Sequence, residues 1–375
     1  MRYAYIFICS LLFSSCFDNS TEVQNRNGAS TSLDTLWTFN LGSFARPMPQ
    51  INGDKIYAAG WVNVFSIDKQ TGNQHWNSQI LDDNEIRGKQ FLVNGDYVMV
   101  NHVDKTYAWD KKTGKKAWEF TYHDTLEIRI VGNHTITPLG FSFNSTKDKA
   151  INLDHEGNLH SMFQMTDNFN TNGVEYGEGK LFVGQKHTVN GAYTRGRMSA
   201  FDLYSGDSLW SYTTDYNGFS FAPPIYEDGI VYGVTVGNSD SCVAVALNAS
   251  TGEVIWENIN EYLWGRALSV GKEHIYVNTG GSLAALDKET GEINCRVEWL
   301  GSDWNPPSYL EGYVYHVRDY ELLVIDDNSG EILHEEPVPP GGSYFWNVVV
   351  SEDKVFAQTS RQLIAYQPWH LREEE

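Results

Sequence analysis

The stretch from Ala108 to Phe120 reads AWDKKTGKKAWEF, and the spacing of its residues recurs along the chain. An Asp or Asn is followed by two residues, a Thr or Ser, a Gly, three further residues and a Trp. A copy at Asp154 is worn, because its Gly157 comes early and no Trp follows. The other copies are Asp68/Thr71/Gly72/Trp76, Asp110/Thr113/Gly114/Trp118, Asp202/Ser205/Gly206/Trp210, Asn248/Thr251/Gly252/Trp256, and two with Cys295 or His334 in place of Trp, Asp287/Thr290/Gly291 and Asp326/Ser329/Gly330.

Successive copies begin 39 to 48 residues apart, which is the period of a repeat architecture. Each copy follows two short apolar-rich runs, such as KLFVG and SAFDL, that predict β-strands separated by tight turns. We expect the Asp side chain to accept backbone N–H groups in the turn, and the Gly to adopt a positive φ. The Trp on the outgoing strand then has a large apolar surface to bury against a neighbouring unit.

The two ends of the chain complement each other. LWTFNLG, from Leu36, matches an outgoing strand without a preceding turn, and KVFAQTSRQLIAYQ, from Lys354, matches the middle strands without an outgoing one. Joined, they add one unit to the seven copies. The sequence therefore predicts an all-β, eight-bladed propeller of four-stranded antiparallel blades, closed by N- and C-terminal strands in one blade. The alternative is an open solenoid, which would leave both half-units unpaired.

AWDKKTGKKAW, AFDLYSGDSLW, ALNASTGEVIW and ALDKETGEINC resemble the pyrroloquinoline-quinone-type (PQQ-like) propeller repeat, and the resemblance spans nearly everything from Trp37 to Gln367. That family includes quinoprotein dehydrogenases, the BamB type of outer-membrane assembly lipoprotein and many uncharacterised exported proteins. Its repeat tryptophans dock between blades, so the resemblance implies a structural role for the repeat residues here. These are Trp37, Asp68, Gly72, Trp76, Asp110, Gly114, Trp118, Asp202, Gly206, Trp210, Gly252, Trp256, Asp287, Gly291, Asp326 and Gly330.

The N-terminal segment predicts export. Residues 1–15 combine Arg2, an apolar run too short to span a bilayer and small residues, which resembles a lipoprotein signal peptide with Cys16 as the lipidated residue. The alternative is an ordinary secretory signal in which Cys16 is incidental. Phe17, in place of the Asp that marks inner-membrane retention in lipoproteins, favours the outer membrane, facing the periplasm or the cell exterior. Residues 16–34 are expected to form a flexible tether, 35–369 the propeller and 370–375 an acidic tail.

Composition excludes several classes of function. A net charge of −21 argues against nucleic-acid binding and against direct adsorption to anionic lipid, so the lipid is the one expected membrane link. No nucleophile elbow is found, and the eleven histidines lack metal-ligand spacing, so we expect neither catalysis nor a metal. Family dehydrogenases commonly carry adjacent cysteines and calcium at PQQ. This chain has no Cys–Cys pair, so no cofactor is expected, and Cys295 either bonds Cys242 or is simply a small buried residue.

A ring of aromatic, amide and arginine residues recurs in the segments that lead into each innermost strand, which in propellers border the central channel. Arginine forks suit carboxylates or phosphates and flat aromatic rings suit sugars or peptides, so these residues predict a ligand or partner site at the channel mouth. Alternatively, the aromatics fill space between converging strands and the arginines pair with acids such as Glu85 and Asp303. The set is Phe44, Arg46, Arg87, Asn172, Phe219, Phe221, Trp264, Arg266, Trp304, Asn305, Trp346 and Asn347, with Arg129 further along.

Together these features predict a non-catalytic, lipid-anchored, monomeric propeller that acts as a binding or assembly scaffold for an outer-membrane or periplasmic protein. A second hypothesis is a glycan- or anion-binding lipoprotein that uses the same mouth. A third is a quinone-dependent oxidoreductase.

Overall fold

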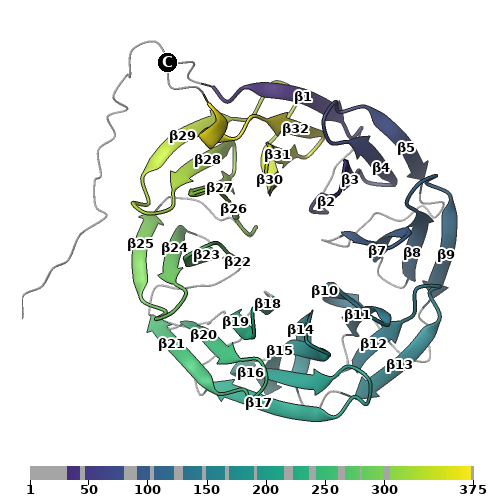
Figure 1. Cartoon of the computed structure of the whole chain (residues 1–375), viewed down its shortest axis with the longest axis vertical. Helices are drawn as coiled ribbons and strands as arrows, with labels where there is room; N and C mark the ends of the chain where they lie inside the picture. Colours follow the sequence, from purple (N-terminus) through teal and green to yellow (C-terminus); the bar gives the residue numbers. More distant parts are fainter. Residues whose placement is uncertain are drawn as a thin grey trace, which may run out of the picture.

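Eight four-stranded antiparallel sheets form a closed ring around a central axis (Figure 1). The predicted eight-bladed propeller is therefore confirmed. The structure is a computed structural model that describes residues 32–42, 47–79, 91–101, 105–121, 130–145, 149–164, 169–189, 192–214, 223–235, 242–260, 267–278, 281–298 and 305–372.

Each blade is numbered from the N-terminus and its strands run from the axis outwards. Blades 1 to 4 are β2 (Gln50–Asn52), β3 (Lys55–Ala59), β4 (Asn63–Asp68) and β5 (Gln74–Gln79); β6 (Phe91–Asn94), β7 (Tyr97–Asn101), β8 (Lys105–Asp110) and β9 (Lys116–Thr121); β10 (Ile130–Thr137), β11 (Gly140–Ser145), β12 (Lys149–Leu153) and β13 (Leu159–Gln164); and β14 (Phe169–Gly177), β15 (Lys180–Val189), β16 (Ala192–Asp202) and β17 (Ser208–Thr214).

Blades 5 to 8 follow in the same way, except that blade 8 takes its outer strand from the N-terminus. They are β18 (Ile225–Glu227), β19 (Ile230–Val234), β20 (Cys242–Asn248) and β21 (Val254–Asn260); β22 (Ala267–Val270), β23 (His274–Asn278), β24 (Ser282–Asp287) and β25 (Ile293–Glu298); β26 (Ser308–Leu310), β27 (Tyr313–Arg318), β28 (Glu321–Asp326) and β29 (Ile332–Pro337); and β30 (Phe345–Ser351), β31 (Lys354–Thr359), β32 (Gln362–Tyr366) and β1 (Thr35–Asn40). A 3₁₀ turn at Trp369–Leu371 follows β32.

Burial follows the position of a strand in its blade. The middle strands are covered on both faces by neighbouring blades, and four successive residues of β3 and of β4 are buried. In blade 1 the outer strand β5 is exposed except around Trp76 and Ser78, because this strand forms the rim of the ring. This difference explains why the middle strands read as continuous apolar runs, whereas the outer ones alternate polar residues with isolated aromatic or apolar ones.

Outside the worn copy at Asp154, the turn between the third and fourth strands uses the same backbone bonds to an Asp or Asn side chain in each repeat. In blade 2, Asp110 Oδ1 accepts the backbone N–H groups of Lys112 at 3.1 Å and Thr113 at 2.7 Å, and the Thr113 hydroxyl at 2.7 Å. These bonds, led by those from Thr113, hold the pKa of the Asp110 carboxyl below its usual value. Gly114 closes the turn at φ +70°. The same geometry requires an Asp or Asn at the start of each turn and a Gly at its end.

In every such turn except that of blade 7, the glycine also receives an aromatic ring from the preceding blade. A Cβ on Gly114 would lie 2.6 Å from the indole of Trp76, and the Trp76 indole N–H donates to Lys111 O at 3.0 Å. Blades 1, 5 and 6 are joined to their preceding blades by Trp37, Trp210 and Trp256 in the same way. In blade 3, where no Trp is present, Phe163 packs on Gly206 of blade 4. At these seams an aromatic ring joins successive blades, and it fits there only because the glycine has no Cβ.

Ring closure depends on both chain ends. β1 pairs with β32, with Trp37 opposite Ala365 and Thr38 opposite Ile364, so the predicted terminal closure is confirmed. At the seam with blade 1, Asp353 accepts Gln70 Nε2 at 2.6 Å and lies 3.1 Å from Lys69 Nζ.

At the seam with blade 7, Glu336 Oε2 accepts the Leu33 N–H at 2.6 Å and contacts His334 Nε2 at 2.9 Å. His334, which occupies the tryptophan position of its repeat, stacks on Trp369 with ring centroids 5.5 Å apart. Both seams therefore depend on residues from opposite ends of the sequence.

Candidate functional site

The ring has two distinct faces. Because the strands within a blade alternate in direction, the linkers between blades and the loops between second and third strands share one face, here called the linker face. The turns between first and second strands and between third and fourth strands form the other, the turn face. Inner strands begin at the linker face, so the topology places there the described residues of the predicted mouth, Asn172, Asn305, Trp346 and Asn347.

Most of that mouth lies outside the described residues. This holds for Phe44, Arg46, Arg87, Arg129, Phe219, Phe221, Trp264, Arg266 and Trp304. Asn172 is described as backbone, within β14. The convergence of these side chains on one ligand therefore stays a prediction.

Three predicted mouth residues are described with their contacts. The backbone carbonyl of Asn305, which precedes the first strand of blade 7, accepts a hydrogen bond from Asn278 Nδ2 at 2.9 Å. Trp346 is half-buried, with its ring 4.8 Å from that of Tyr344. Asn347 is buried, and its amide donates to Gln358 Oε1 at 2.6 Å within blade 8. Asn347 therefore helps to hold its own blade, whereas the two aromatic rings lie next to the linker face.

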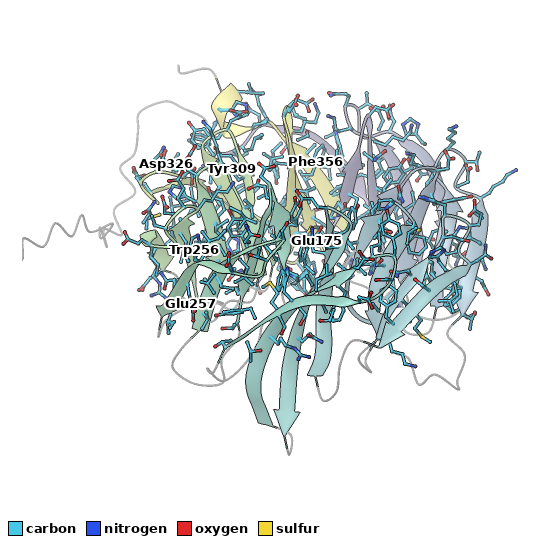
Figure 2. The ribbon with its side chains drawn as sticks, turned by 60° about the horizontal axis from the view of Figure 1, so that its bottom comes forward. Glu175, Trp256, Glu257, Tyr309, Asp326 and Phe356 are labelled. Atoms are coloured by element: carbon cyan, nitrogen blue, oxygen red, sulfur yellow. The ribbon has the colours of Figure 1, made fainter. Side chains whose placement is uncertain are left out.

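Glu175 is an ionisable group on the inner part of the ring. It belongs to β14 of blade 4, and the Thr135 hydroxyl of β10 in the preceding blade donates to its Oε1 at 3.4 Å. Figure 2 shows the labelled side chain near the centre of the ring. Burial raises the pKa of the Glu175 carboxyl to about 7, because few polar groups compensate its charge there. The inner wall thus carries a carboxyl that exchanges a proton near neutral pH.

Replacing Glu175 with Gln should change how stability depends on pH. The folded-state pKa is raised, so the unfolded carboxyl ionises from about pH 4.5 upwards while the folded one keeps its proton until about 7. The wild-type chain should therefore lose stability relative to Glu175→Gln as pH rises through this window, by ~3 kcal/mol in total. Urea unfolding at pH 4.5 and pH 8 measures this. A difference between the two proteins that is the same at both pH values contradicts it.

A buried polar cluster joins blades 6 and 7 on the turn face. His274 Nδ1 lies 2.7 Å from Asp327 Oδ1, and the Tyr276 hydroxyl donates to the same oxygen. The other ring nitrogen of His274 lies 2.8 Å from Asn294 Nδ2. Burial and the Asp327 carboxylate raise the pKa of Tyr276, so its hydroxyl keeps its proton. With Asp327 and His274 both engaged, the cluster is a structural contact between blades and lacks an activated nucleophile.

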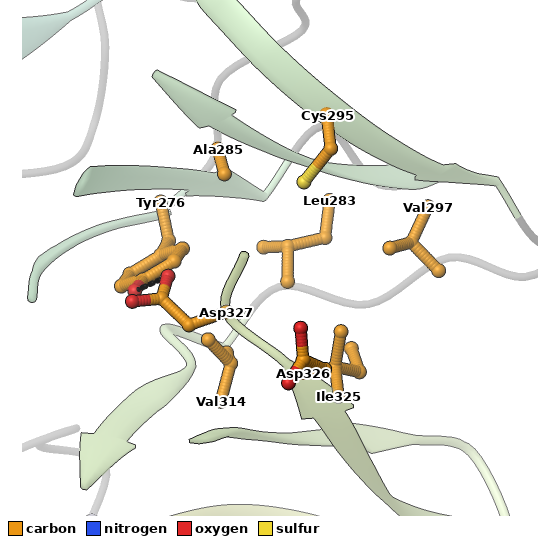
Figure 3. A pocket seen from close by; sticks show the side chains of 9 residues that line it. All are labelled: Tyr276, Leu283, Ala285, Cys295, Val297, Val314, Ile325, Asp326 and Asp327. Carbon is orange, nitrogen blue, oxygen red and sulfur yellow. Dashed lines mark hydrogen bonds between the residues drawn. The ribbon is translucent and has the colours of Figure 1, made fainter. Parts of the chain in front are cut away.

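A small pocket lies beside this cluster, between the same two blades (Figure 3). It is lined by Leu283, Ala285, Cys295 and other apolar side chains, with the Asp327 carboxylate at one end. Cys295 is buried and its sulfur packs near Gly330, where other repeats place an indole. The pocket is therefore the space that a smaller side chain leaves at the tryptophan position.

Sequence reasoning missed this cluster. His274 and Asp327 are 53 residues apart in sequence, and each occupies an ordinary position of its repeat. The available signal was that Asp327 follows the turn Asp, where its counterparts Lys111, Ala249 and Lys288 provide only a carbonyl acceptor for an indole. An acidic residue there, in the one seam with Cys in place of Trp, predicts a polar substitute for that contact.

Among the described residues, no three His, Cys, Asp or Glu side chains are arranged as a metal site. No helix in this part of the chain is long and apolar enough to cross a bilayer.

Comparison with known proteins places the fold. A family profile described as outer membrane protein assembly factor BamB matches residues 29–245 and, in a second match, 239–369. No curated protein matches the chain.

Among solved structures, BamB from Moraxella catarrhalis is similar, with 15% identity, a TM-score of 0.70, and 90% of this chain and 100% of that chain covered. A europium-containing methanol dehydrogenase has 11% sequence identity and a TM-score of 0.73, with 90% of this chain and 93% of that chain covered. Quinohemoprotein alcohol dehydrogenase from Comamonas testosteroni has 12% sequence identity and a TM-score of 0.70, with 90% of this chain and 76% of that chain covered.

At these identities the solved structures support the fold alone, whereas the two profile matches together extend over nearly all of the ring. The chain belongs to the family of outer membrane protein assembly factor BamB.

Proposed function

We propose that the chain is a non-catalytic, lipid-anchored scaffold that binds a protein of the outer membrane or periplasm through its linker face. The observation that carries the proposal is the match to the BamB family over nearly all of the ring. The use of polar groups within the ring adds support. The buried acids Asp327 and Glu336 serve contacts between blades, which suits a rigid platform.

Quinone chemistry is not part of this proposal, although two of the similar structures are dehydrogenases. Their identities of 11% and 12% carry over the fold and nothing about a cofactor. The chain lacks the adjacent cysteines commonly found in family members that bind PQQ. Cys295 lies at a seam between blades, packed against Gly330, and does not fit that site. We therefore assign no step to a quinone.

The test is co-isolation from cells that make the full-length chain with a C-terminal tag. We expect an outer-membrane or periplasmic protein to be retained in detergent extracts, and to be lost when Arg46→Glu and Arg266→Glu, at two residues of the predicted mouth, are combined. The matched control is Lys112→Glu with Lys115→Glu, two exposed lysines in the turn of blade 2. It makes the same charge change on the turn face and should leave retention unchanged.

Other outcomes would replace the proposal. Equal retention by both double variants moves the interface away from the mouth. Saturable calorimetric binding of PQQ with calcium favours an enzyme. Binding on a glycan array that is abolished by Trp264→Ala favours the glycan hypothesis.

A further inference from the structure

Blade 4 contains a hairpin that is much longer than its counterparts. β15 has 10 residues and β16 has 11, whereas second and third strands in the other blades have 5 to 7. At about 3.3 Å per residue, four extra residues add ~13 Å. Figure 2 shows these teal strands projecting beyond the ring. Since the loop between second and third strands belongs to the linker face, the hairpin projects from that face.

Near the end of this hairpin, the outer side of β16 pairs with no described strand. β15 and β16 pair with each other as far as Val189 opposite Ala192. On the outer side of β16, the pairing with β17 ends at Gly196 opposite Thr214. On the inner side of β15, the pairing with β14 begins at His187 opposite Phe169. Within the described chain, residues 192–195 therefore present an open strand edge.

The hairpin is positively charged, whereas the chain as a whole is negatively charged. Between Leu181 and Phe201 it carries Lys186, Arg195 and Arg197 and no acidic residue, in a chain of net charge −21. Its base is held by Arg197, whose Nε donates to Gln185 Oε1 at 3.0 Å. Cationic residues in these two strands, without an acidic one, disfavour pairing between copies of this edge and favour an acidic partner.

We propose that residues 192–195 of β16 bind an extended acidic segment of a partner protein as an added strand. An unpaired row of N–H and C=O groups is satisfied by another polypeptide backbone, which a lipid headgroup cannot supply. The charge of the whole chain also opposes contact with an anionic bilayer. The inference rests on the proposed scaffold function and identifies the element and the partner chemistry.

The experiment uses the chain without residues 1–15 and a fluorescent peptide of about ten residues that alternates Glu with Val or Thr. We expect saturable binding by anisotropy. Lys186→Glu with Arg195→Glu should weaken it at least about tenfold. The turn-face control, Lys112→Glu with Lys115→Glu, should bind like the wild type. The same peptide with alternate backbone nitrogens methylated should also bind at least about tenfold more weakly, because a methylated nitrogen cannot donate to the strand.

Each contrary result removes the proposal. No binding, or equal weakening by both double variants, excludes this edge as the acidic-segment site. If the methylated peptide binds as tightly as the unmodified one, the peptide is held by charge alone and is not an added strand. Binding restricted to phosphatidylglycerol vesicles makes the hairpin a membrane contact. If any of these holds while co-isolation still depends on Arg46 and Arg266, the scaffold function stands and only the hairpin's role is lost.

Discussion

Gly114→Ala is expected to lower the free energy of unfolding by ~4 kcal/mol, although it adds a single methyl group. The new Cβ would lie 2.6 Å from the indole of Trp76, so the ring must move from its place between blades 1 and 2. Displacement gives up much of the burial of a side chain that is only 8% exposed, which costs about 3 kcal/mol. The positive φ adds about 1 kcal/mol for a residue with Cβ.

Gly95→Ala is the matched control for this prediction, because it lies in the same blade. Gly95 has φ +49°, and a Cβ there would meet nothing within 4 Å. This variant should lose only about 1 kcal/mol, from the backbone alone. In a Trp76→Ala background, Gly114→Ala should also cost no more than about 1 kcal/mol, since the ring it displaces is gone. Urea unfolding of the four variants measures these differences, and equal losses for Gly114→Ala and Gly95→Ala would contradict the steric account.

The repeat made the fold predictable because its determinants are local. The Asp-to-Gly turn and the Trp beyond it lie within nine residues, so the sequence shows both the turn and the blade contact. Blade 3 shows the tolerance of this pattern. Its worn turn still ends at Gly157, with φ +83°, and Phe163 takes the place of the missing Trp. Even the worn copy thus keeps a glycine that receives the ring from the preceding blade.

The contents of the seams were less predictable, because they depend on which blades become neighbours. His274 and Asp327 meet only once blades 6 and 7 stand side by side, and the nature of that contact depends on the loss of an indole at Cys295. The lengthened hairpin left a clearer trace. The interval from Asp154 to Asp202, 48 residues, is the longest between copies, and it contains Asn190–Gly191, a strong hairpin signal between the two strands.

Removing residues 1–40 is expected to have the largest effect of all on the ring. The deletion removes β1 and with it the strand that covers β32, so the outer edge of blade 8 is left open. It also takes away Trp37, which packs on Gly72, and Phe39, whose ring lies 5.3 Å from that of Phe65. Loss of these aromatic contacts and of buried Leu33 should cost more than ~6 kcal/mol, enough to unfold or aggregate a typical domain.

The control is removal of residues 1–31 alone, which keeps Leu33 and its bond to Glu336. This shorter deletion should leave the melting temperature within about 2 °C of the full chain, whereas the longer one should lower it by at least about 10 °C or give aggregates by light scattering. A peptide of residues 32–42 added to the longer deletion should restore part of the loss, since β1 contributes through pairing and packing rather than through connectivity. If the two deletions melt alike, closure by the N-terminal strand contributes little, and the other seams must be sufficient to hold eight blades in a ring.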